Sequence, residues 1–269
     1  MTPSPFMALA ALLAAGTAQA SAYERAPAGE GLCQYWPDPG TPKVRRVAYE
    51  VSDPGAAQAC RSGGDPVLAI RNAFAGWAAA ARPDESVPCT DMQLVFDGVG
   101  ACADLYDCWD HDRFIALTTT TYRLSTGVIL DADVEVNAGD GEGEEGFLLT
   151  CIDPPAPVCT EERRIGCIGM DLQNAISHEV GHFLGFAHSD SRGSTMYAKA
   201  SRGETGKRVL SADAVEGMCD VYPRGGAVTT CGTRPQGCST IGAPDSWLGL
   251  AALALLLRRR ARQETTTPA

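Results

Sequence analysis

Hydrophobic residues recur along this chain with two different periods, which predict helices and strands in the same folded unit. Residues 66–81 carry apolar side chains at helical spacing, through Leu68, Ala69, Phe74 and Trp77. Short runs rich in strand-forming residues occur at 44–51, 92–96 and 114–118. We expect the helix to cover a sheet that these strands help to build. The pattern therefore predicts a mixed fold of helices and strands.

A stricter alternation occupies residues 127–137. Every second position is apolar, at Val128, Leu130, Ala132, Val134 and Val136. Most of the positions between them are acidic, so one face of this strand is expected to be buried and the other charged. Such a strand fits the edge of a sheet, where its exposed backbone can pair with an extended peptide. An edge strand that binds nothing explains the same pattern equally well.

The two ends of the chain differ from its middle. Residues 1–20 contain an apolar run followed by the small-x-small sequence Ala18-Gln19-Ala20, which predicts a signal peptide cleaved after Ala20. A buried N-terminal helix is the alternative. Residues 21–43 and 224–246 are rich in Gly, Pro and small polar residues, as is typical of an N-terminal segment and a linker. They bracket one folded unit, residues 44–223.

Residues 247–269 combine a short apolar run with a cluster of arginines. As a helix, the apolar run reaches only about 16 Å, less than the roughly 30 Å hydrocarbon core of a membrane. A lone cysteine, Cys238, followed by such a run and by arginines resembles the C-terminal sorting signal of myxobacterial surface proteins. That resemblance implies that Cys238, within the linker, anchors the protein to the membrane or cell surface. A plain tail anchor is the alternative.

Composition restricts the compartment and the partners. The chain has 11 cysteines and no CxxC pair, which favours disulfides in an exported protein. If Cys238 is the anchor, the other ten cysteines can form five disulfides, and Cys151 and Cys159 could close a small ring around a Pro-rich loop. The net charge of -11 repels phosphate and disfavours nucleic acid as a partner. We expect an extracellular or outer-membrane-attached monomer.

Three of the four histidines lie in residues 171–198. His178 and His182 are four residues apart, so they share one face of a helix that Asp171 is placed to cap. Gly185 can end this helix and reverse the chain, which brings His188 back as a third ligand. Three neutral imidazoles leave one tetrahedral position of a single zinc ion open for water, as is typical of catalytic rather than structural zinc.

Glu179 follows the first histidine, where its carboxylate can reach a zinc-bound water and act as general base. The segment therefore predicts metal-assisted hydrolysis. An ordinary amphipathic helix is one alternative, but it leaves the offsets of three histidines, a glutamate and a glycine to accident. A surface binding or adhesion module with a structural metal site is another, and the presence of Glu179 argues against it.

The sequence HEVGHFLGFAH, residues 178–188, fits the extended HExxHxxGxxH motif of the metzincin zinc peptidases. Ser189 after the third histidine and Tyr197 after Met196 resemble the matrixin branch of that group. So do residues 72–77, 126–138 and 210–223. This resemblance implies an α+β (α/β-like) fold, namely a matrixin-like catalytic domain with a mixed five-stranded sheet, three helices and a zinc cleft.

The same resemblance implies a zinc-dependent endopeptidase that acts on proteins or peptides. Met196 would form an apolar base beneath the zinc, and Tyr197 would line the specificity pocket. The substrate would pair with the 127–137 strand, at Leu130, Asp131 and Ala132.

Two further features leave alternatives open. The acidic loop at 137–147 could hold Ca²⁺ or be a solvated loop. Cys33 is expected to be half of a disulfide, and the alternative is a thiolate placed on the zinc.

Overall fold

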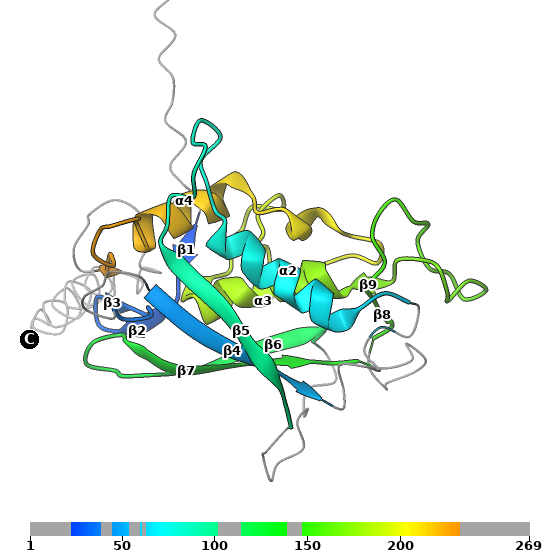
Figure 1. The fold of residues 1–269 in the computed structure, drawn as a ribbon, viewed down its shortest axis with the longest axis horizontal. Helices are drawn as coiled ribbons and strands as arrows, with labels where there is room; N and C mark the ends of the chain where they lie inside the picture. Colours follow the sequence, from blue (N-terminus) through cyan, green and yellow to red (C-terminus); the bar gives the residue numbers. More distant parts are fainter. Residues whose placement is uncertain are drawn as a thin grey trace, which may run out of the picture.

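The computed structural model describes residues 23–38, 45–53, 60, 63–101, 114–138 and 147–231. Within these residues the chain forms an α+β fold of three α-helices and small sheets (Figure 1). The predicted signal peptide, residues 139–146 of the acidic loop, and the C-terminal segment with Cys238 lie outside the described residues. In the described part, no helix has the length and apolar character needed to span a membrane.

Helix α2, Pro66–Ala78, begins where the sequence predicted. The side chain of Asp65 caps it by accepting the backbone N–H of Leu68 at 3.1 Å, and Pro66 occupies the first turn. Its buried side includes Ala69 and Trp77, as predicted. Leu68 is instead 51% exposed, because the buried positions repeat every four residues from Ala69 and leave Leu68 to the side of that stripe.

Helix α3, Leu172–Phe183, carries the first two histidines, and both of its ends match the sequence prediction. Oδ1 of Asp171 accepts the backbone N–H of Asn174 at 2.7 Å, which caps the helix. Gly185 has a φ of 85°, a conformation that favours glycine, and the chain reverses there. A third helix, α4, covers Ala212–Val221.

Two strand pairs lie along one side of the helices (Figure 1). Strands β4 (Arg45–Asp53) and β5 (Met92–Ala101) are parallel and are joined through α2, whereas β6 (Ala116–Tyr122) and β7 (Ile129–Val136) are antiparallel. The remaining strands are short and are β1 (Glu24–Arg25), β2 (Pro27–Gly29), β3 (Leu32–Cys33), β8 (Leu149–Thr150), β9 (Met170–Asp171) and β10 (Phe186–Ala187). Hydrogen bonds join the described strands two by two, while α2 packs on β5 and α3 lies against β6 and β7.

The alternation predicted for residues 127–137 is interrupted by a bulge. Thr121 pairs with Asp131, but the next residue, Tyr122, pairs with Ile129. Leu130 is therefore the extra residue of the ladder. As a result Ile129 is 1% exposed and Leu130 is 54% exposed, the reverse of the predicted burial. Beyond the bulge the predicted apolar face does pack against the core, at Ala132, Val134 and Val136.

The core fixes α3 against α2 through an aromatic anchor. Trp77 is fully buried, and its indole N–H donates to the carbonyl of Ser177 at 2.8 Å. The ring of Phe186 stacks on Trp77 with centroids 5.4 Å apart. Since Ser177 directly precedes the first histidine, this hydrogen bond sets the position of that histidine along α2.

Four disulfides join described cysteines: Cys33–Cys231, Cys60–Cys151, Cys89–Cys219 and Cys159–Cys167. The predicted half-disulfide at Cys33 is confirmed. The ring between Cys151 and Cys159 is wrong, because Cys151 reaches back across the fold to Cys60 whereas Cys159 closes a loop of its own. Cys102, Cys108 and Cys238 lie outside the described residues.

The packed unit includes residues on both sides of the 44–223 range. Arg45 is 2% exposed and bonds to Asp38, which precedes the range, and to Asp91. Its guanidinium also donates to the carbonyls of Pro223 and Gly226, at and beyond the other limit. The buried guanidinium of Arg45, in the first strand of the predicted unit, thus binds segments that lie at or beyond both limits of that unit.

Candidate metal centre

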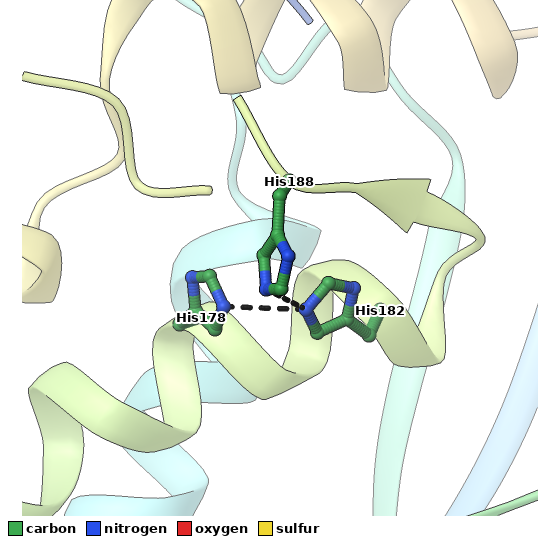
Figure 2. A group of neighbouring side chains, drawn as sticks. All are labelled: His178, His182 and His188. Carbon is green, nitrogen blue, oxygen red and sulfur yellow. Dashed lines mark hydrogen bonds between the residues drawn. The ribbon is translucent and has the colours of Figure 1, made fainter. Parts of the chain in front are cut away.

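The three histidines of residues 178–188 converge on one point (Figure 2). His178 and His182 project from the same face of α3, and His188 approaches them from the chain that follows β10. Nε2 of His182 lies 3.2 Å from Nε2 of His178 and 3.2 Å from Nε2 of His188. The predicted helix face and chain reversal therefore do bring the three rings together.

Backbone carbonyls fix which nitrogen of two of these rings carries the proton. Nδ1 of His178 lies 2.8 Å from the carbonyl of Thr195, and Nδ1 of His182 lies 2.8 Å from that of Phe186. A carbonyl only accepts, so each Nδ1 donates and each Nε2 presents a lone pair. Two lone pairs facing each other at 3.2 Å repel, and a cation between them removes that repulsion.

The two Nε2 spacings measured from His182 fit zinc. Tetrahedral coordination with Zn–N bonds of about 2.0–2.1 Å places two ligand nitrogens roughly 3.3 Å apart. Burial lowers the pKa of all three histidines, to about 3 for His178, so the rings are neutral at ordinary pH. Neutral imidazole is the form that binds metal. His178 is buried, His182 is partly buried and His188 is exposed, so the metal group faces solvent on the side of His188.

Glu179 lies beside this group with its carboxylate held by a hydroxyl from β6. Oγ1 of Thr118 donates to Oε2 of Glu179 at 2.7 Å. Burial raises the pKa of this carboxyl, and the hydrogen bond from Thr118 acts in the opposite direction. A buried, oriented carboxylate next to a metal site has the attributes of a proton acceptor.

Met196 packs against α3 at Gly181, the residue before His182, and is 1% exposed. Its close approach depends on Gly181, since a Cβ at that position would lie 2.1 Å from the Met196 sulfur. The backbone of the same segment is tied to the chain after His188, because Ser189 N–H donates to the Met196 carbonyl at 2.9 Å. Met196 is thus an apolar side chain packed against the turn of α3 between the first two histidines.

The segment after Met196 is held by a buried lysine. Nζ of Lys207 donates to the carbonyls of Tyr197 and Lys199, both at 2.8 Å, and lies 3.6 Å from Glu204. The backbone N–H of Lys207 donates to Oδ1 of Asn174, one turn before His178 on α3. Desolvation lowers the pKa of the Lys207 ammonium. Tyr197 itself is half-buried.

Leu130, Asp131 and Ala132 are placed one strand away from Glu179. They lie on β7, whose ladder partner is β6, and it is Thr118 of β6 that bonds to Glu179. Among the described residues, β6 has no ladder partner besides β7. The strand beside the metal group is therefore β6, which the sequence identified only as a strand.

Sequence reasoning missed the residues that support the histidines and Glu179: Thr118, Asn174, Gly181, Thr195, Phe186 and Lys207. Most act through backbone carbonyls or from distant parts of the chain, and neither property leaves a local pattern. A weak signal existed for Thr118, because it belongs to a run of four threonines that is unusual in a strand next to a predicted metal site.

Comparison with known proteins adds one positive result. The family model for the matrixins matches residues 62–223, more than half of the chain and all of the metal group. In a search of curated proteins, none matches this chain.

Proposed function

We propose, since this chain belongs to the matrixin family of zinc metallopeptidases, that it is an exported endopeptidase in which Glu179 is the general base. One observation supports the assignment of the base above all others. A buried carboxylate, oriented by Thr118, interacts electrostatically with His188, one of three converging histidines whose two Nε2 spacings from His182 fit zinc. A metal group that only stabilised the fold would need no such neighbour.

The residues divide the chemistry among them. His178, His182 and His188 would hold the zinc through Nε2. The bound ion supplies Lewis acidity, which polarises a peptide carbonyl and acidifies water. Glu179 accepts a proton from the attacking water and delivers it to the departing amine nitrogen. Thr118 keeps the carboxylate pointed toward the metal group during both transfers.

An extended substrate would pair with the strand next to the metal group. Within the described part of the chain, the edge of β6 that does not face β7 has no ladder partner, so its backbone groups could take part in such pairing. We thus propose that the substrate pairs with β6, the strand of Thr118, and not directly with Leu130, Asp131 and Ala132. Those three residues lie on β7 and would support β6 from its other edge. Tyr197 would line one wall of the specificity pocket.

Export and surface attachment are part of the same proposal. Four disulfides among the described cysteines fit an oxidising compartment, in which matrixins generally act. The signal peptide at 1–20 and an anchor at Cys238 would then deliver the protein to the cell surface as a monomer. Ca²⁺ at the acidic loop would be an additional ligand.

Removing the metal separates a peptidase from an adhesion module with a structural metal. We would treat the full chain with a chelator and follow both its circular dichroism and its cleavage of an unfolded protein. A catalytic zinc in a domain braced by disulfides predicts that cleavage stops while the fold persists, and that zinc restores cleavage. If the domain unfolds on chelation, or if the untreated protein cleaves nothing, the peptidase assignment fails.

A further inference from the structure

The N-terminal segment, residues 23–36, covers the turn that connects the second and third histidines. Strand β1 pairs antiparallel with β10, with Glu24 opposite Ala187 and Arg25 opposite Phe186. The N–H of Ala26 continues this contact by donating to the carbonyl of Gly185 at 2.9 Å. These residues lie outside the range that the matrixin model matches, 62–223.

Two carbonyls at the C-terminal end of α3 have no partner within the helix and accept hydrogen bonds from side chains elsewhere. One donor is Trp36 of this segment, and the other is Tyr222, which the segment contacts. The indole N–H of Trp36 donates to the Phe183 carbonyl at 2.8 Å. Tyr222 donates to the Leu184 carbonyl at 2.8 Å and in turn accepts the backbone N–H of Trp36 at 3.1 Å. The carbonyls of Phe183 and of the C-cap residue Leu184 are thus satisfied by the N-terminal segment and by a residue that it contacts.

A buried arginine locks the segment in place. Arg25 is 8% exposed, and Nη2 of its guanidinium donates to the Gln34 carbonyl at 2.6 Å. Its other nitrogens reach the carbonyls of Gly185 and Thr229, at 3.4 and 3.0 Å. One planar side chain therefore joins three parts of the chain.

The backbone of the segment at Gln34 lies so close to the turn that only glycine fits at position 185. A Cβ at Gly185 would lie 2.4 Å from the carbonyl oxygen of Gln34. Next to that contact, Cys33 forms its disulfide with Cys231, across a sequence separation of 198 residues. The disulfide ties the segment covalently to residue 231, next to Thr229, whose carbonyl accepts from Arg25, and so limits its movement away from the turn in addition to the hydrogen bonds.

The covered turn serves two of the proposed zinc ligands directly. The carbonyl of Phe186, the residue opposite Arg25, fixes the ring of His182 through Nδ1. Ala187, opposite Glu24, directly precedes His188. The position of the N-terminal segment therefore sets the orientation of His182 and the starting point of His188.

We infer that residues 23–36, clamped by Cys33–Cys231, form a brace that positions His182 and His188 for zinc. The inference rests on the zinc site of the proposed function but not on peptide hydrolysis. Residues that orient metal ligands without touching the metal commonly change metal affinity by about 10–100-fold when they are altered. Loosening the brace should therefore release zinc faster.

The test uses the full chain and measures zinc release to a chromogenic chelator, with no peptide present. The variant Cys33→Ser/Cys231→Ser frees the brace, and Cys159→Ser/Cys167→Ser is the matched control, because that disulfide closes a loop of only 8 residues' separation. We expect the first variant to release zinc at least about tenfold faster and the control to match the parent protein.

A general loss of stability must be separated from the loss of positioning. Trp36→Phe keeps a ring beside Phe183 and removes one hydrogen bond, so it tests the brace even if the cysteine variant does not fold. When Co²⁺ replaces zinc, the ligand-field absorption of Trp36→Phe should be shifted relative to the parent protein. The absorption of Cys159→Ser/Cys167→Ser should match that of the parent. Unchanged zinc release and spectra in both brace variants, equal effects in the control, or a parent protein that binds no zinc would overturn the inference. If the parent protein binds zinc and the brace variants release it faster, but the parent protein cleaves no peptide, only the proposed function is overturned.

Discussion

The hydroxyl of Thr118 on β6 lies 2.7 Å from Oε2 of Glu179 on α3, although the two residues are 61 positions apart in sequence. The same oxygen is 3.1 Å from the Glu179 carbonyl, so the strand is anchored to this one turn of the helix. Because a hydroxyl has a single proton and the carboxylate is the nearer and stronger acceptor, the proton goes to Oε2. Thr118 therefore orients the proposed base.

Replacing Thr118 by valine tests this role, because valine keeps the shape and removes the hydroxyl. A hydrogen bond to a charged group contributes about 1.5–3 kcal/mol, so we expect kcat to fall by about tenfold or more while zinc content is unchanged. Thr118→Ser keeps the hydroxyl and should stay near the parent rate. Steady-state kinetics with one peptide decide the matter, and equal rates for the valine and parent proteins would show that Thr118 has no part in the reaction.

Gly181 should not tolerate alanine. In an open helix this change stabilises by roughly 0.5–1 kcal/mol. At Gly181 the added methyl group would collide with the fully buried Met196, and overpacking costs about 1–3 kcal/mol. We expect the free energy of unfolding to fall in chemical denaturation.

Gly76 in α2 provides the matched control, because a Cβ there would contact nothing within 4 Å. Gly76→Ala should be neutral or stabilising. If the two alanine variants behave alike, close packing of Met196 on the helix is not what requires glycine at 181.

Lys207 holds the segment that would form the wall of the specificity pocket, so its loss should act on substrate binding. Lys207→Met fills similar space but removes the bonds to the Tyr197 and Lys199 carbonyls. We expect KM to rise by about tenfold, which corresponds to about 1.4 kcal/mol, with a smaller change in kcat. Lys199→Met makes the same change of charge at an exposed position and should leave KM unchanged. A KM equal to that of the parent would contradict the role of Lys207.

Tyr222 makes stability sensitive to alkaline pH. Burial raises the pKa of its hydroxyl to about 12, above the ordinary value of 10, so the folded state keeps the proton more tightly than the unfolded state. The resulting stabilisation, about 2–3 kcal/mol, is fully present below pH 10 and is lost as the pH rises to 12.

Denaturation of the parent protein and of Tyr222→Phe at several pH values checks this expectation. The phenylalanine variant should lose about 1–3 kcal/mol at neutral pH, because two hydrogen bonds disappear. Between pH 10 and 12 its stability should decline less than that of the parent. Parallel declines would show that Tyr222 is not the responsible group.

The metal group was predictable because its geometry is local. His178, His182 and Gly185 obey helix periodicity and the conformational freedom of glycine, and the structure has both features as predicted. Asp171 as the cap followed from the same local rules. Short-range stereochemistry was sufficient to predict that the three residues lie close together, whereas contacts from distant segments orient their rings.

What could not be predicted depends on contacts between distant parts of the chain. The bulge at Leu130 is set by the register of β6 on β7, so alternation alone assigned the wrong burial to Leu130. Disulfide partners follow from the fold, which is why Cys151 pairs with Cys60 and not with its neighbour Cys159. The contact of residues 23–36 with the turn after α3 likewise has no local sequence pattern.

We propose that Glu179, rather than the metal group alone, makes this protein a hydrolase, and Glu179→Gln is the sharpest test of that role. Glutamine keeps the size of the side chain but cannot accept the proton. We would measure peptide cleavage and bound zinc in the same preparations. We expect one zinc per chain in both proteins and a kcat lower by about 10²–10⁴-fold in the variant. A zinc-loaded variant that cleaves peptides at the parent rate would contradict it.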